Sequence, residues 1–321
     1  MMRANTVRRA VTMIASLMAC AVISVTAAAQ TAQHVTGTTV TMAPPEGFEP
    51  ATNFSGFADP KTQSSILIAE LPPQAWPQLS AMFGSLDTVR AAFKQKGIDV
   101  ASLDKVPTAS SEAFLARGTQ TMGDIKIGKW VALAQGSRTV MITVQAMAGA
   151  RLDDAAVRTM LKTVSLGDPP SEADKLASLP FKVAPSAPFR VLDTMGGAAV
   201  SMTVGDKDVD PKGEQPLLIV SAQIGNAPVL SDDAATVAKT LLHQTRHMEA
   251  ASIETEKQVS FGGATDGVLL EGKTDDNKRF VQYFATGAAG HFVRLLSYFA
   301  ADRSDEVRPA VEKIAASVAF K

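Results

Sequence analysis

Hydrophobic residues recur at helical spacing near the end of each half of the chain. One set is Val157, Met160, Leu161 and Val164, and the other is Val307, Val311, Ile314 and Val318. Steps of three and four residues place such side chains on one face of an α-helix. Each set predicts an amphipathic helix that buries a single apolar stripe.

Shorter apolar runs predict strands. Two of them, at 65–69 and 217–222, stand early in the two halves. Two later runs, at 278–285 and 292–300, contain few polar residues on either of the two faces that a strand would present. Strands that are apolar on both faces need cover on both sides. The pattern predicts an α+β fold, with a mainly antiparallel sheet flanked by helices.

Four short motifs occur twice in the same order, which indicates an internal duplication. The offset between the copies stays between about 140 and 155 residues. The pairs are Met42-Ala43-Pro44-x-x-x-Phe48 with Val183-Ala184-Pro185-x-x-x-Phe189, 65–69 with 216–220, Leu115-x-x-Gly118 with Leu269-x-x-Gly272, and Ala134-Gln135-Gly136 with Ala285-Thr286-Gly287.

Capping and turn residues define the elements of the second copy. Ser231 is a favourable helix N-cap, and Asp232 and Asp233 would complement the helix dipole in the first turn. The polar stretch 273–277 predicts a tight turn between strands, and the glycine-containing stretch 286–290 predicts a hairpin.

Similar signals mark a helix in the first copy. Ser85 or Asp87 would begin it, and Gly97 would end it, because glycine readily adopts the left-handed conformation that follows a helix. The two copies therefore share one order of elements.

A proline-rich stretch separates the copies. Pro169 and Pro170 block both helix and ladder hydrogen bonds, which predicts a short, stiff linker with few contacts of its own. The predicted organisation is a signal peptide at 1–29, a first α+β domain at 38–167, a linker at 168–176 and a second α+β domain at 177–321. Each domain is expected to bury its own core and to fold by itself.

The N-terminal segment has the pattern of an export signal. Three arginines precede an apolar stretch at 10–25, which is too short for a bilayer span of about 20 residues. The small residues Ala27-Ala28-Ala29 then predict cleavage before Gln30. The protein is therefore expected in the periplasm or outside the cell, with no transmembrane anchor in the mature chain. An uncleaved membrane anchor and a twin-arginine signal at Arg8-Arg9 are the alternatives.

Cys20 is the single cysteine of the chain. Leu17-Met18-Ala19-Cys20 resembles a lipobox, which offers a second route in which Cys20 becomes lipidated. The apolar residues 21–25 do not suit the polar tether that a lipoprotein needs, so cleavage near Gln30 is preferred. The mature chain would then lack thiols, which excludes disulfides and cysteine nucleophiles.

Net charge argues against binding to nucleic acid. The chain has 31 lysines and arginines and 32 aspartates and glutamates. Removal of the three arginines of the signal leaves 28 against 32, a net charge of −4. A general nucleic-acid binder would show a strong basic excess.

The opening of the first copy resembles the PsbP-like fold. Residues 40–48, Val-Thr-Met-Ala-Pro-Pro-Glu-Gly-Phe, are similar to the strand, proline and glycine-aromatic element that begins this family. The second copy departs from it, with Pro188 where glycine is expected. The family includes an extrinsic photosystem II protein and DcrB-like periplasmic lipoproteins. The resemblance implies two tandem α/β/α sandwiches with a non-enzymatic accessory or binding role, and it assigns no functional residue.

Two groups of residues invite a metal-binding interpretation. His243 and His247 have the i,i+4 spacing that can hold one ion on a helix, but they fall on the polar face and lack a third ligand. Asp206-x-Asp208-x-Asp210 resembles the start of a calcium loop, but Pro211 and Leu217 replace the glycine and glutamate that the loop needs. We expect no metal site and no cofactor.

Catalytic motifs are also weak. Ser102-x-x-Lys105 has the spacing of a serine–lysine pair, which works only on a helix, whereas this segment is expected to be extended. No catalytic residue is assigned on this basis.

Trp76 stands in a proline-rich loop, 71–77, and is a candidate partner contact because tryptophan is frequent at binding hot spots. The alternative is that Trp76 folds back on its own domain.

These observations favour an exported two-domain protein that is not an enzyme. It would act as a binding or accessory module of the cell envelope, with another envelope protein or a small ligand as its partner. The alternative is a hydrolase or metal-dependent enzyme with its site in the interdomain cleft. An enzyme requires convergent titratable groups in one pocket, whereas a binding module requires an apolar groove with a polar rim.

Export can be tested directly. Because Ala27-Ala28-Ala29 satisfies a signal peptidase, the intact mass of the protein recovered from the periplasm should correspond to a chain that begins at or near Gln30. A mass that corresponds to a chain beginning at a diacylated Cys20 would contradict this prediction.

Overall fold

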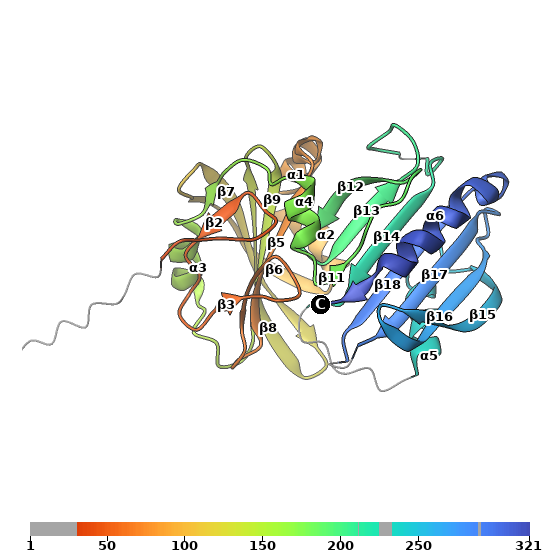
Figure 1. Ribbon diagram of the computed structural model, residues 1–321. Helices are drawn as coiled ribbons and strands as arrows, with labels where there is room; N and C mark the ends of the chain where they lie inside the picture. The colour runs from red at the N-terminus through yellow and green to blue at the C-terminus, as the bar shows by residue number, and fades with distance from the viewer. Residues whose placement is uncertain (1–30, 211, 225–232, 288–289) are drawn as a thin grey trace, which may run out of the picture.

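Two seven-stranded antiparallel sheets, one from each half of the chain, form the framework of the protein (Figure 1). The computed structural model describes residues 31–210, 212–224, 233–287 and 290–321, so the predicted signal peptide lies outside the described residues. In spatial order, the first sheet contains β3 (Glu49–Pro50), β4 (Gly56–Asp59), β5 (Ser64–Leu71), β9 (Thr139–Ala146), β8 (Ile125–Gln135), β7 (Glu112–Met122) and β6 (Ile98–Pro107).

The second sheet repeats this order. It contains β12 (Arg190–Met195), β13 (Ala199–Thr203), β14 (Leu217–Ala222), β18 (Phe292–Phe299), β17 (Arg279–Thr286), β16 (Ala264–Lys273) and β15 (Ser252–Phe261). Matching strands follow one another in the same sequence in both halves. The predicted duplication is therefore present in the topology.

Helices cover both faces of each sheet, as the two-sided apolar strands require. The first sheet lies between α3 (Asp154–Leu161) on one face and the pair α1 (Trp76–Met82) and α2 (Leu86–Lys94) on the other. The second sheet lies between α6 (Ser304–Ser317) and α5 (Ala234–His243), with η2 (Ala301–Arg303) leading into α6. Each half thus has two apolar cores, and the predicted α+β class is confirmed.

The closing helices occupy equivalent places. All eight apolar residues predicted to form their stripes are buried. The hydroxyl of Thr163, just after α3, accepts a hydrogen bond from the Ala43 backbone N–H at 2.9 Å. The hydroxyl of Ser317, in the last turn of α6, accepts one from the Ala184 N–H at 2.9 Å. The two opening motifs are therefore attached to their closing helices in the same way.

Short strands complete this attachment in each half. In the first, β2 (Val40–Met42) pairs with β1 (Gln33–His34) and with β10 (Ser165–Leu166), which follows α3. In the second, β11 (Phe181–Lys182) pairs with β19 (Ala319–Phe320), which follows α6. Phe48 and Phe189 are both buried beside these strands, as the repeat predicts.

One repeat match is displaced by a residue. The sequence aligned 65–69 with 216–220, which sets Ile66 against Leu217. In the structure Ile66 pairs with Val144, and Leu218 pairs with Ser297. Val144 and Ser297 hold equivalent positions when the paired residues are counted outward from the hairpin turns at Gly136 and Gly287. Ile66 therefore corresponds to Leu218. Because successive side chains of a strand point to opposite faces, only this register buries both residues in matching cores.

Both helix beginnings can now be assigned. In α2, Ser85 is the N-cap and forms a reciprocal capping box with Thr88, which confirms the first of the two predicted starts. In α5 the N-cap is Asp233, whose carboxylate accepts hydrogen bonds from the N–H groups of Ala235 and Thr236. The prediction that Asp233 lies in the first turn was wrong, and Ser231 and Asp232 lie outside the described residues.

The predicted linker is more structured than its prolines suggested. Residues from its second half form most of α4 (Glu172–Ala177), which begins immediately after the N-cap Ser171. Leu176 packs against the second core, and Lys175 pairs with Asp193. The expectation of few contacts was wrong, because proline restricts only the residues next to it and the chain resumes a helix at Glu172.

Two matching glycines show why the repeated Leu-x-x-Gly motif exists. Gly118 and Gly272 each lie on a strand opposite a β-bulge of the edge strand, at Val100/Ser102 and Ile253/Thr255. A Cβ at Gly118 would lie 2.3 Å from the Asp99 carbonyl oxygen, and one at Gly272 would lie 1.9 Å from that of Ser252. Only glycine lets the bulged strands approach this closely.

Glycine-to-alanine substitutions test this constraint. Gly118→Ala and Gly272→Ala should each lower the free energy of unfolding by about 1–3 kcal/mol, because the added methyl group meets backbone that cannot move cheaply. Gly167→Ala is the matched control, since its nearest contact would be at 3.6 Å. Chemical denaturation of the three variants measures the difference. Equal stability of all three would show that the bulges tolerate a side chain.

Candidate functional site

A partly buried cluster of charges joins the two halves. Arg138, in the β8–β9 turn, contacts Asp193 of β12 and lies 3.7 Å from the carboxylate of Glu70. Lys175 of α4 approaches the same Asp193 at 2.9 Å. The cavity beside this cluster is only about 10 Å³, which is room for about one water molecule. The cluster is therefore a structural joint and leaves no space for a ligand.

A backbone contact lies next to the joint. The Ser55 N–H donates to the Gly196 carbonyl at 2.9 Å, so the β3–β4 connection meets the β12–β13 turn. Gly197 adopts a φ of +64°, and a Cβ there would lie 2.4 Å from the Ser55 nitrogen. The two halves are in direct contact at this point, and two cavities open beside it.

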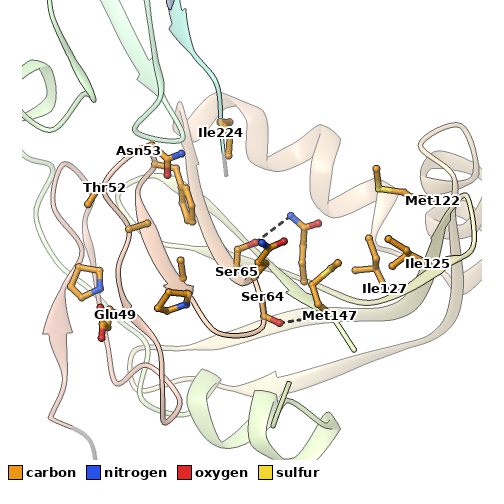
Figure 2. A pocket seen from close by; sticks show the side chains of 17 residues that line it. Glu49, Thr52, Asn53, Ser64, Ser65, Met122, Ile125, Ile127, Met147 and Ile224 are labelled. Atoms are coloured by element: carbon orange, nitrogen blue, oxygen red, sulfur yellow. Dashed lines mark hydrogen bonds between the residues drawn. The ribbon is translucent and has the colours of Figure 1, made fainter. Parts of the chain in front are cut away.

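The first cavity, called the groove below, has a volume of about 590 Å³. It is lined by segments 49–54 and 63–65, by Met122, Ile125 and Ile127 of the β7–β8 hairpin, by Gln145 and Met147, and by Ile224 from the second half. Figure 2 shows the hairpin residues at one end, Glu49 and Thr52 at the other, and Ile224 on a separate segment.

Apolar side chains project into the groove without being buried. Met122, Ile125 and Ile224 are 59%, 51% and 48% exposed. The hairpin that carries the first two turns through Gly123-Asp124, with Gly123 at a φ of +58°, which a two-residue turn of this kind requires. The tight turn holds Met122 and Ile125 side by side at the tip.

Polar groups make up the floor of the groove. Ser64 accepts a hydrogen bond from the Met147 N–H at 3.0 Å, and Gln145 donates one to the Ser65 hydroxyl at 3.3 Å. Lys129 of β8 in turn donates to the side-chain oxygen of Gln145. Lys129 is only 7% exposed, and burial lowers the pKa of its ammonium to about 8. No carboxylate pairs with it among the described residues.

The second cavity, called the interdomain cavity below, has a volume of about 720 Å³. It shares segment 51–53 with the groove, so the two cavities adjoin. Its walls include Leu179, Phe292 and Phe320, and its polar members include Gln223, His291 and the cation Lys321. None of its described lining residues is an aspartate or glutamate.

The sequence candidates for metal binding are not brought together. Helix α5 ends at His243, and His247 follows at a φ of +67°, so the expected helical i,i+4 pair does not exist. The helix ends because residues 244–248 form a turn in which the Met248 N–H donates to the Thr245 carbonyl. Both histidines are exposed, as predicted, and no group of three potential ligands occurs among the described residues.

The acidic triplet serves its own loop. Asp208 pairs with Arg190 at 2.8 Å, and Asp210 accepts a hydrogen bond from the Gln215 N–H at 2.6 Å. Two of the three carboxylates are thus engaged in contacts within the protein.

Ser102 and Lys105 lie on β6, which confirms that the segment is extended. Lys105 instead lies over the Phe114 ring at 5.6 Å. A strand places residues three apart on opposite faces, so the pair cannot act as a serine–lysine dyad.

Trp76 does not stand in a loop. Residues Pro73–Ala75 form a short 3₁₀ turn, η1, and Trp76 begins α1, where Pro77 is tolerated in the first turn. The Trp76 ring is half-buried and lies 6.3 Å from that of Phe114. Trp76 thus packs on its own sheet, the alternative offered by the sequence, and lies apart from both cavities.

Comparisons with known proteins give no family for this chain. No family model matches it, and no curated protein matches it. Among solved structures, one that is similar is the T6SS immunity protein TplEi of Pseudomonas aeruginosa in complex with an "L" peptide. The two sequences are 9% identical, and the match covers 86% of this chain and 99% of that one at a TM-score of 0.29. Its apo structure is similar at 10% identity, covering 89% and 96% at a TM-score of 0.30.

A third solved structure, DynU16 from the dynemicin biosynthetic locus, is 10% identical over 79% of this chain and 96% of that one, at a TM-score of 0.15. TM-scores at this level do not establish a shared fold. The PsbP-like resemblance therefore stays a prediction. Among the described residues, no helix is long and apolar enough to cross a membrane.

The buried Lys129 makes a prediction about pH. Its folded pKa of about 8 lies below the value of about 10.4 for an unfolded lysine, so the unfolded chain binds an extra proton between these values. The free energy of unfolding contributed by Lys129 should therefore rise with pH over this window, by at most about 1.4 kcal/mol per pH unit.

Lys129→Met should remove this rise. The measurement is urea denaturation of wild type and variant from about pH 7.5 to about pH 9.5. Lys126→Met is the matched control, because Lys126 lies exposed on the same strand. A Lys129→Met variant that keeps the wild-type pH dependence would show that the ammonium is not desolvated.

Proposed function

We propose that this protein is a non-enzymatic binding module of the cell envelope, whose groove holds an extended and largely apolar segment of a partner protein. One observation carries the proposal: three exposed apolar side chains, Met122, Ile125 and Ile224, converge on one open groove. Its place in the envelope rests on the N-terminal segment, 1–29, and on cleavage near Gln30.

The clustering of these side chains supports an interaction site. Exposed large hydrophobic residues in the described parts of the chain are Met122, Ile125, Met195, Val209 and Ile224, and three of these five line the groove. Single exposed hydrophobics need no explanation, whereas a gathered set with a polar rim is typical of a binding surface. Burying the exposed half of each would contribute about 1 kcal/mol per side chain.

The shape and polarity of the groove favour an extended segment. An extended segment presents both apolar side chains and backbone polar groups, and the groove offers the Ser65 hydroxyl and Gln145 amide beside its apolar wall. Met122 and Met147 supply flexible side chains that adapt to the shape of a partner. Glu49 is the one charged residue among the described lining residues, so a neutral or basic segment is preferred over an acidic one.

The residues that line the two cavities disfavour the enzyme alternative. Acid–base catalysis needs two positioned titratable groups within hydrogen-bond reach of the substrate. In the groove the described lining residues include no histidine, and in the interdomain cavity His291 has no carboxylate beside it. These linings suit binding better than hydrolysis.

Peptide selection tests the proposal. Random dodecapeptides displayed on phage and selected on the mature chain should converge on sequences with alternating apolar residues and few acids. A synthetic peptide of the selected sequence should bind wild type, and Ile125→Asp should weaken that binding by at least about tenfold, because a carboxylate would be desolvated at the contact.

Val209→Asp is the matched control, since Val209 is also exposed, at 65%, but lies outside the groove. Titration calorimetry of the three proteins with the same peptide gives the affinities. Selection without a common sequence, or equal loss of affinity in both variants, would refute the groove as the binding site.

A further inference from the structure

We propose that Ser65 selects the partner of the groove by donating a hydrogen bond to a backbone carbonyl oxygen of the bound segment. This assignment rests on the proposed function, because it names the chemical group that the same groove recognises. It depends on three features of the groove floor: a row of paired residues, the direction of the hydrogen bonds along that row, and the buried cation at one end of it.

Ser65 belongs to a row of residues that face one another across the first sheet. Ser65 of β5 pairs with Gln145 of β9, which pairs in turn with Lys129 of β8. On its other side Ser65 pairs with Ala58, and Ala58 pairs with Glu49. Paired residues of antiparallel strands project from the same face of a sheet. Glu49, Ala58, Ser65 and Gln145 all line the groove, so Lys129 ends a row that forms the groove floor.

Lys129 lies where the covered part of this face meets the open part. Val131 and Leu133, two and four residues farther along β8, are buried in the core beneath α1 and α2. Ile127, two residues before Lys129, lines the groove instead. Alternate residues of a strand share a face. The position of Lys129 at this boundary accounts for its low exposure of 7%, and it places the ammonium behind the groove floor.

Hydrogen bonds along the row run in one direction. An ammonium group has donors but no acceptor, so Gln145 presents its Oε1 to the Lys129 Nζ. The amide NH₂ of Gln145 therefore faces Ser65, and it donates to the hydroxyl at 3.3 Å (Figure 2). The partly exposed Ser65 side chain has no further hydrogen-bond partner within the described parts of the chain. Its own hydrogen is free to be donated into the groove.

The buried cation favours an acceptor opposite Ser65. Hydrogen bonds in a chain polarise one another, and Lys129 has no carboxylate partner among the described residues. The positive potential behind the hydroxyl therefore attracts a partly negative atom, which the carbonyl oxygens of an extended segment supply along each of its edges. Glu49 stands two strands away from Ser65, about 10 Å, and it disfavours a full negative charge in the groove. A carbonyl oxygen meets both conditions.

A peptide whose acceptors are all in its backbone tests this assignment. The probe is an acetylated and amidated heptapeptide in which valine and alanine alternate between terminal lysines. Titration calorimetry measures its affinity for the full mature chain. Ser65→Ala should weaken binding about fivefold, the usual effect of losing one neutral hydrogen bond. Ser80→Ala is the matched control, since it removes a serine hydroxyl on α1, outside the groove, and should leave the affinity unchanged.

Gln145→Glu tests the direction of the row at nearly constant side-chain shape. A carboxylate only accepts, so it would accept from both Lys129 and Ser65, and the hydroxyl would no longer donate to the peptide. The affinity should fall about fivefold, even though the added negative charge attracts the terminal lysines. Gln63→Glu adds the same charge to the groove outside the row, and it should leave the affinity unchanged or raise it.

The double variant Ser65→Ala/Gln145→Glu should bind the peptide no more weakly than Ser65→Ala alone, because both changes remove the same hydrogen bond. Urea denaturation of each variant checks that it remains folded. Equal weakening by Gln145→Glu and Gln63→Glu would show an effect of charge alone and would overturn the assignment.

The assignment and the proposed function fail in different ways. Peptide binding that is lost in Ile125→Asp but unaffected by Ser65→Ala and Gln145→Glu would overturn the role of Ser65 and leave the groove as a binding site. A wild-type chain that does not bind the peptide would also overturn the assignment, whereas the phage selection decides whether the groove binds a segment of another composition.

Discussion

The ion pair between Arg138 and Asp193 is the interaction on which both cavities depend. It connects a turn of the first sheet to an edge strand of the second, with Glu70 and Lys175 completing a neutral, partly buried group of four charges. Compared with apolar residues, buried ion pairs add little stability, but the loss of one partner costs about 3–5 kcal/mol. Such a cluster therefore fixes the orientation of the halves, and that orientation places Ile224 across the groove from the β7–β8 hairpin.

The interface also reflects the duplication. The β3–β4 connection and the β12–β13 turn are equivalent elements of the two copies, and they meet through the hydrogen bond from Ser55 to Gly196. Each copy keeps its own two cores, and the contact between them is made by turns and by strand residues such as Glu70 of β5 and Asp193 of β12, and not by a shared sheet. Segment 51–53, which leads to this contact, lines both the groove and the interdomain cavity. Both cavities are thus products of the joint between copies.

The sequence predicted what local periodicity controls. The closing helices, the two-sided strands and the order of the repeat followed from the spacing of residues such as Val157 and Val311. It did not predict the cavities, because these arise where segments distant in the chain meet. Lys129, a lysine inside the apolar run 125–134, was a visible signal that was overlooked.

Divergence between the copies separates residues that the fold requires from residues that it does not. Both copies keep a glycine opposite the bulge, Gly118 or Gly272, because packing demands it. The neighbouring hairpin tips differ: the first carries exposed Met122 and Ile125, whereas the second, at 273–279, is polar and held by Thr274, whose backbone N–H donates to the Lys278 carbonyl at 2.9 Å. The polar tip shows that the fold closes this hairpin without exposed apolar residues. Folding therefore does not account for Met122 and Ile125, which is consistent with the partner contact that we propose for them.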